Sequence, residues 1–286
     1  MKHAYLIIAH NEFALLRLLV SCLDDSRNDI YVHIDRKVKD LPDLHTEKAG
    51  LFMLEKRVDV HWGDLSMVEA EYALFDTAVK NGPYQYYHLL SGVDLPIKSQ
   101  DYIHAFCDQH NGKEFIGYTL TEITPEVVRK VQRWHLFPED FKNKSFIKRA
   151  LRALCLKVQE WLGLYRNREI AFKKGSQWVS VTEGMARFFL SKKDWMEKVF
   201  THTFCSDEMV MQTLCWESPF RENIYNTMDD GAGCLRAIGW ENGCLADWSM
   251  KDFEYLQNSP ALFARKFNSR DMSFINKVLD LSTHEA

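Results

Sequence analysis

The sequence of 286 residues has none of the short motifs that most often hold the phosphates of a nucleotide. There is no G-x-x-x-x-G-K-[ST] loop and no G-x-G-x-x-G, which excludes the two common glycine-rich phosphate cradles. No Asp-x-Asp pair occurs either, and carboxylates of that kind commonly bridge a divalent ion to a diphosphate. A nucleotide site in this chain would therefore need cationic side chains in place of the metal ion.

The chain also lacks an excess of positive charge, since its formal net charge is −4. Domains that bind nucleic acid are usually basic, so we expect no nucleic-acid partner. The seven cysteines form no C-x-x-C pair, which argues against a zinc knuckle. We predict free thiols, with pairing of Cys205 with Cys215 and of Cys234 with Cys244 as the alternative.

Long apolar runs are absent as well. No stretch approaches the roughly 20 apolar residues that a membrane span needs. The first residues lead directly into a strand pattern, without the basic segment and small-residue cleavage site of a signal peptide. We therefore expect a cytoplasmic protein, with peripheral attachment to the inner face of a membrane as the alternative.

The first third of the chain alternates strand and helix patterns. Continuous apolar runs indicate strands buried on both faces, and apolar residues spaced three and four apart indicate helices. The predicted strands are Tyr5–Ala9, Asp29–Ile34, Leu51–Leu54, Val58–Val60 and Tyr86–Leu90, and the predicted helices are Phe13–Leu23 and Ser66–Val79, the second capped by Ser66. This order predicts a single α/β domain whose mixed, mainly parallel sheet has helices on both faces.

Ligands of such sheets bind at the carboxyl ends of the strands. Three polar stretches fall at predicted strand ends: residues 9–11, 33–37 and 91–94. We expect the binding site there.

The segment from Lys142 to Arg168 has eight basic residues and a single acid, Glu160. Apolar residues recur along it at helical spacing, so we predict a basic amphipathic helical insertion at about 141–168. Two interpretations stay open. The helix packs its apolar face on the domain and leaves its basic face in water, or it contacts an anionic membrane or an anionic acceptor.

Two places carry residues suited to group transfer. Arg265 and Lys266 lie between Phe263 and Phe267, and a guanidinium beside an ammonium suits a diphosphate. Glu208 precedes an apolar helical stretch, where Ser206 or Asp207 would cap the helix. Each place also has a purely structural alternative. Arg265 and Lys266 would then be an exposed basic pair on the surface, and Glu208 would be an acid in the first turn of a helix, where it interacts favourably with the helix dipole.

Seven stretches resemble the core-2/I-branching β-1,6-N-acetylglucosaminyltransferase family, which includes the peptide O-xylosyltransferases, and they occur in the family's order. They are AYLIIAHNE (4–12), IYVHIDRK (30–37), VHWGDLSMVEAEYALF (60–75), YYHLLSGVDLPIKS (86–99), GSQWVSVT (175–182), SDEMVMQTL (206–214) and PALFARKF (260–267). The chain is most similar to bacterial members that build surface polysaccharides.

The resemblance implies a GT-A-like fold and inverting chemistry with no metal and no other cofactor, a UDP-sugar being the co-substrate. Glu208 matches the family's catalytic base, and Arg265 and Lys266 match its diphosphate-binding residues. The family pattern assigns the remaining donor-site roles to Asp35 and Lys37 at the uridine, to Trp62, Ser176, Gln177 and Trp178 around the sugar, and to Asp94 at the strand end or in a turn.

The donor sugar stays open between N-acetylglucosamine, which we favour, and xylose. The expected acceptor is a hydroxyl of a glycan or of a lipid-linked glycan. Two other functions compete: a glycosidase, which needs two opposed carboxyl groups, and a catalytically silent sugar- or membrane-binding module on the same fold.

Overall fold

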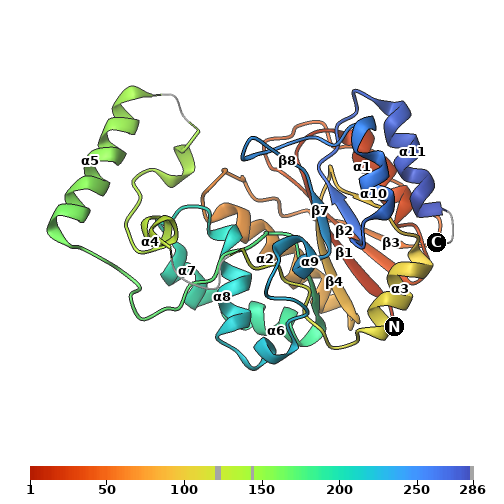
Figure 1. Cartoon of the computed structure of the whole chain (residues 1–286), viewed down its shortest axis with the longest axis horizontal. Coiled ribbons are helices and arrows are strands. Elements are labelled where there is room, and N and C mark those ends of the chain that lie inside the picture. The colour runs from red at the N-terminus through yellow and green to blue at the C-terminus, as the bar shows by residue number, and fades with distance from the viewer. Residues whose placement is uncertain (120–123, 143–144, 284–286) are drawn as a thin grey trace.

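The computed structural model describes residues 1–119, 124–142 and 145–283, and its centre is a five-stranded sheet with the order β3-β2-β1-β4-β6 (Figure 1). The first four strands in that order are parallel and β6 runs antiparallel to β4. The bounds are β1 His3–Ala9, β2 Asn28–Ile34, β3 Gly50–Met53, β4 Tyr86–Ser91 and β6 Ser180–Thr182. This is the mixed, mainly parallel α/β arrangement predicted from the sequence.

Both faces of the sheet are covered, because successive side chains of β1 enter different cores. Leu6 and Ile8 pack in the core that includes helix α2 (Ser66–Asn81), whereas Tyr5 and Ile7 pack in the core that includes helix α1 (Phe13–Cys22). Every residue of β1 is buried, which is why the strand reads as a continuous apolar run.

Two local predictions were wrong. Residues 58–60 form no strand, and the Val58 amide donates instead to His33 Nε2 at 2.8 Å. Ser66 is the first residue of α2 and not its cap, because its hydroxyl accepts from the His61 amide at 2.8 Å.

A second sheet joins distant parts of the chain in the order β5-β10-β7. Its strands are β5 (Leu95–Pro96), β10 (Phe263–Arg265) and β7 (Arg236–Ile238). Strand β10 brings Arg265 beside the end of β4, where its guanidinium reaches Ser91. The guanidinium of Arg236 is buried between the two sheets and donates to Val179 O and to Ser180 Oγ, both at 3.0 Å.

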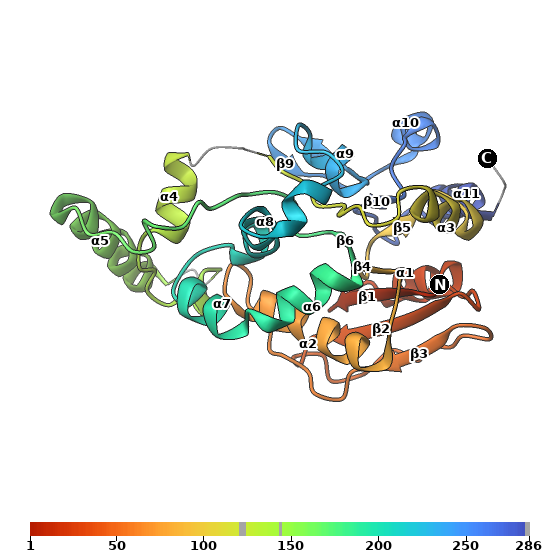
Figure 2. The same cartoon turned by 90° about the horizontal axis from the view of Figure 1, so that it is seen from below.

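The remaining elements surround these sheets (Figures 1 and 2). The helices are α3 Gln100–Gln109, α4 Pro125–Val131, α5 Phe146–Leu162, α6 Glu183–Ser191, α7 Lys193–Phe200, α8 Val210–Trp216, α9 Asp230–Cys234, α10 Phe253–Asn258 and α11 Met272–Thr283, and a hairpin pairs β8 (Trp240–Glu241) with β9 (Cys244–Leu245).

Helix α5 lies at the end of the molecule remote from the central sheet, as both views show (Figures 1 and 2). Its side toward the domain buries Arg152, Leu156 and Gln159. Most of its large apolar residues face outward: Ile147 is 69% exposed and Trp161 is 84% exposed. An apolar face packed on the domain, one of the two interpretations above, is therefore wrong. Lys144, a basic residue of the predicted insertion, lies outside the described residues.

All seven cysteines lie in the described ranges and are free, as predicted. Across the described part of the chain, no helix combines the length and the apolar character needed to cross a bilayer.

Candidate active site

A cavity of about 370 Å³ opens at the carboxyl ends of β1 and β4. Two of the three predicted strand-end stretches contribute to it, through residues 9–11 and 91–93, and the stretch 33–37 does not. Its lining comes from all parts of the chain: Ile8, Ala9, His10, Asn11, Trp62, Met67, Ser91, Gly92, Val93, Thr119, Lys174, Gly175, Ser176, Gln177, Trp178, Asp207, Glu208, Asp230, Ile238, Trp240, Leu245 and Arg265.

Arg265 presents a fixed cation to this cavity. Its Nη1 lies 3.0 Å from Asp94 Oδ1 and also bonds the Ser91 hydroxyl, and its Cζ lies 4.2 Å from the Trp178 ring centroid. Asp94 itself is fully buried and accepts from the Ser91 amide at 2.9 Å. Asp94 therefore closes the turn after β4 and holds the guanidinium, but it does not line the cavity.

Glu208 faces the same cavity from a short 3₁₀ turn, Ser206–Glu208, that precedes α8. Its Oε2 lies 3.4 Å from Lys130 Nζ and 3.7 Å from Lys174 Nζ, and both ammonium groups also pair with Glu126, at 2.9 and 3.2 Å. Burial lowers the pKa of Lys130, but its bonds to the two carboxylates outweigh burial and raise that pKa overall. The two ammonium groups hold the Glu208 carboxylate in one place.

No side chain caps this turn, so the predicted capping role of Ser206 or Asp207 was wrong. Asp207 instead lines the cavity, and among the described residues its Oδ1 is buried with no hydrogen-bond partner. Burial and the neighbouring Glu208 raise the pKa of Asp207 to about 7. Beyond it lies Glu71 of α2, only 3% exposed, whose pKa is raised well above its usual range by burial and by Asp207.

The loop of residues 174–178 forms another wall. The Ser176 amide donates to Asp230 Oδ1 at 2.7 Å, and Gln177 Nε2 donates to Glu71 Oε1 at 2.7 Å. Gly175 must be a glycine, because a Cβ there would lie 1.9 Å from the carbonyl oxygen of Gly117. Its amide donates to the Glu208 carbonyl at 2.9 Å, which ties the loop to the turn that carries Glu208.

Four predicted donor-site residues lie outside the lining: Asp94, described above, and Asp35, Lys37 and Lys266. Lys37 Nζ pairs with Asp35 at 3.2 Å and with Asp59 at 2.7 Å, at the end of β2. Lys266 points away from Arg265 and pairs with Asp247 at 3.0 Å. Contacts with the uridine and the diphosphate therefore stay predictions for these side chains.

The sequence profile of the Core-2/I-Branching enzyme family matches residues 3–273. The chain belongs to that family. Its relatives include N-acetyllactosaminide beta-1,6-N-acetylglucosaminyl-transferase of Homo sapiens and of Mus musculus, each 24% identical over 99% of this chain and 72% of the relative. A solved structure, the crystal structure of S. aureus TarS 1-349, is similar over 48% of this chain and 42% of that chain, with 14% identity and a TM-score of 0.27.

The resemblance drawn from the seven stretches is thus confirmed, and this Core-2/I-Branching enzyme is a glycosyltransferase. Its fold brings together most of the site residues that the resemblance implies. Lining one cavity are Trp62, Ser176, Gln177, Trp178, Glu208 and Arg265.

Sequence reasoning missed several residues of the Core-2/I-Branching site. Asp229 caps α9 by accepting from the Ala232 amide at 2.7 Å, and its neighbour Asp230 lines the cavity. Glu71 left a detectable signal, since it is an acid on the apolar stripe formed by Val68 and Leu74. Lys130 and Lys174 could not be identified from the sequence, because only the folded chain brings them to Glu208.

Proposed function

We propose that this protein is an inverting, metal-independent glycosyltransferase that moves a sugar from a UDP-sugar to a hydroxyl of a glycan or lipid-linked glycan in surface polysaccharide synthesis. N-acetylglucosamine is the first candidate sugar and xylose the second. One observation supports the proposal above the others: a held carboxylate, Glu208, and a clamped guanidinium, Arg265, line the same cavity.

In the proposed reaction, Glu208 accepts the proton of the acceptor hydroxyl. The hydroxyl oxygen forms the new bond to the anomeric carbon on the face opposite UDP. The bond from that carbon to the diphosphate oxygen breaks, and its electron pair leaves with UDP. Arg265 stabilises the growing negative charge of the diphosphate, because a guanidinium binds two phosphate oxygens at once.

The contacts that hold Arg265 keep the entropy cost of binding a diphosphate small. Its guanidinium is held by Asp94 and Trp178 before any ligand arrives, so little side-chain freedom is lost on binding. Trp62 and Trp178 supply aromatic walls beside the polar groups, a common composition of ligand sites.

Calorimetric titration of UDP into the full chain tests the donor site, first with EDTA and then with Mn²⁺. We expect binding in EDTA that is lost in Arg265→Ala and retained in Arg270→Ala, an exposed arginine outside the cavity lining. Binding only with Mn²⁺ would overturn metal independence and keep the transferase. The absence of binding under both conditions would favour the silent sugar- or membrane-binding module.

We also propose that α5 makes a peripheral contact with an anionic membrane. Its exposed face carries the apolar residues Ile147, Leu151, Leu154, Val158, Trp161 and Leu162. Basic residues flank that face in a chain that is acidic overall, which complements anionic lipid headgroups. Buried apolar area and headgroup attraction together favour docking on the bilayer surface.

A further inference from the structure

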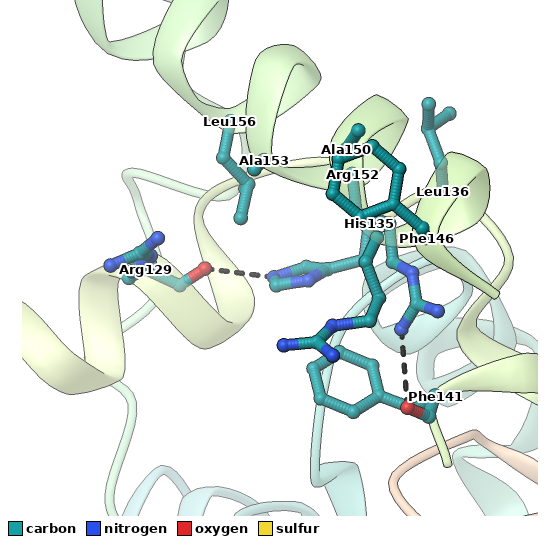
Figure 3. A pocket seen from close by; sticks show the side chains of 10 residues that line it. Arg129, His135, Leu136, Phe141, Phe146, Ala150, Arg152, Ala153 and Leu156 are labelled. Atoms are coloured by element: carbon teal, nitrogen blue, oxygen red, sulfur yellow. Dashed lines mark hydrogen bonds between the residues drawn. The ribbon is translucent and has the colours of Figure 1, made fainter. Parts of the chain in front are cut away.

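A second cavity, of about 610 Å³, lies between α5 and the chain that follows α4. Figure 3 shows α5 along one side of it and the backbone that carries Arg129 and His135 on the other. Its lining is apolar apart from His135 and three arginines: Arg129, His135, Leu136, Phe141, Phe146, Arg149, Ala150, Arg152, Ala153 and Leu156. No carboxylate occurs among these described lining residues.

The three arginines differ in what they already bind. Arg152 is 7% exposed, and its guanidinium donates to the carbonyl oxygens of Asp140 and Phe141 at 3.2 and 3.3 Å (Figure 3). It therefore holds α5 on the domain. Arg129 and Arg149 are exposed at the cavity, where they can pair with an anion.

His135 adds no charge to the cavity near neutral pH. Burial lowers the pKa of its imidazole, and its Nε2 bonds the Arg129 carbonyl oxygen at 2.9 Å (Figure 3). The positive charge of the cavity thus comes from arginine, whose guanidinium binds phosphate in a two-point geometry.

This cavity shares a wall with the site that contains Glu208. Phe141 stacks on Phe204 with ring centroids 3.9 Å apart, and both rings contact Trp62 edge-on, at 6.0 and 5.4 Å. Phe141 lines the cavity beneath α5, whereas Trp62 lines the catalytic cavity. A molecule held beneath α5 therefore lies one aromatic layer away from the catalytic cavity.

We infer that the cavity beneath α5 binds the lipid phosphate of the acceptor, with the phosphate at Arg129 and Arg149 and the hydrocarbon chain on the apolar lining. The inference rests on the proposed function and names its acceptor class: a glycan linked through phosphate to a lipid. The membrane contact proposed for α5 places this cavity beside the bilayer that would hold such an acceptor.

The test is calorimetric titration of dodecyl phosphate, below its micelle concentration, into the full chain. We expect the double variant Arg129→Gln/Arg149→Gln to weaken binding about tenfold or more, since bonds to charged groups contribute strongly. Lys157→Gln is the matched control, because it removes one positive charge from the exposed side of the same helix, outside the lining. An equal loss in that control would show general attraction and overturn the site.

Two further ligands test the phosphate group and the hydrocarbon chain separately. Inorganic phosphate that binds as tightly as dodecyl phosphate would show an anion site without a lipid role. Dodecyl maltoside that binds as tightly would show an apolar site without a phosphate role. Either result overturns the inference, and so does unchanged binding in the double variant.

A filling variant, Ala153→Trp, keeps every charge and is expected to reduce dodecyl phosphate binding as strongly as the arginine double variant. UDP titration of the same variants reports on the donor site and on folding. Loss of lipid phosphate binding with intact UDP binding supports the inference. In the native chain, binding of UDP without binding of dodecyl phosphate contradicts this inference alone, and binding of dodecyl phosphate without binding of UDP contradicts the donor site alone.

Discussion

The guanidinium of Arg265 lies on the indole of Trp178, with its Cζ 4.2 Å from the ring centroid, and Asp94 holds it from the side at 3.0 Å. These residues come from three stretches that are far apart in the chain. Arg265 is 16% and Asp94 is 1% exposed in their side chains, so the pair is largely shielded from water. The arrangement fixes a cation at the cavity in the absence of any ligand.

Replacing Asp94 by Asn should weaken UDP binding about tenfold, because Arg265 would lose a charged hydrogen bond that positions it. Calorimetry measures the affinity, and thermal unfolding of the same samples separates positioning from general damage. Asp247→Asn, which frees Lys266 instead, is the matched control. Equal losses in both variants would show that Lys266 contributes as much as Arg265.

Replacing Glu208 by Gln should lower the rate of sugar transfer by about 10²–10⁴, the usual contribution of a general base. UDP affinity should change little, because the base acts on the acceptor. Steady-state kinetics and UDP titration measure the two effects. Glu126→Gln, which alters the other carboxylate bound by Lys130 and Lys174, should retain most of the activity. Normal turnover in Glu208→Gln would place the base elsewhere.

The stability of the protein should depend on Asp207 as the pH rises. Its pKa of about 7 lies above that of an unfolded aspartate, so its contribution to stability is fully present below about pH 4 and is lost as the pH rises through 7. Asp207→Asn removes this loss and should be more stable than the native chain at pH 8, by on the order of 2 kcal/mol.

Chemical denaturation at pH 5 and at pH 8 measures that difference. The difference in the free energy of unfolding between Asp207→Asn and the native protein should be larger at pH 8 than at pH 5. An equal difference at pH 5 and at pH 8 would show that Asp207 is ionised throughout this pH range despite its burial.

Truncating the outer face of α5 should release the protein from membranes. Leu154→Ser/Trp161→Ser removes apolar area without a change in charge, and we expect at least a tenfold loss of binding. Co-sedimentation with vesicles of phosphatidylglycerol and phosphatidylcholine measures it. Tyr255→Ser, a similar truncation of a 60% exposed ring on α10, is the control. Unchanged sedimentation of the double variant would remove α5 from the membrane contact.

The sheet was predictable because burial on both faces leaves continuous apolar runs in the sequence, and the turns between them end those runs clearly. Tyr5–Ala9 and Asp29–Ile34 were predicted to within two residues of β1 and β2. The strand predicted at Val58–Val60 was wrong because two valines around an aspartate cannot show whether a neighbouring strand offers them hydrogen bonds. That information lies in the partner, here the side chain of His33.

The site was predictable only in part. Glu208 and Arg265 stood out through ordered motifs, and both line the cavity. Lys266 shares the motif of Arg265, but it follows the last residue of strand β10 and pairs with Asp247 instead. Lys130 approaches Glu208 from a segment 78 residues away, a distance in sequence that no local pattern bridges.

The family, the mainly parallel sheet and the amphipathic character of the segment around α5 could all be predicted from the sequence, because they depend on local spacing and ordered motifs. The direction in which α5 faces depends on contacts that exist only in the folded protein. Its polar residues Arg152 and Gln159 bind backbone carbonyl groups of the domain, so most of its large apolar residues face outward. The same is true of the Arg265 clamp and of the two adjoining cavities, since hydrogen bonds and ring contacts between remote segments exist only once the chain has folded.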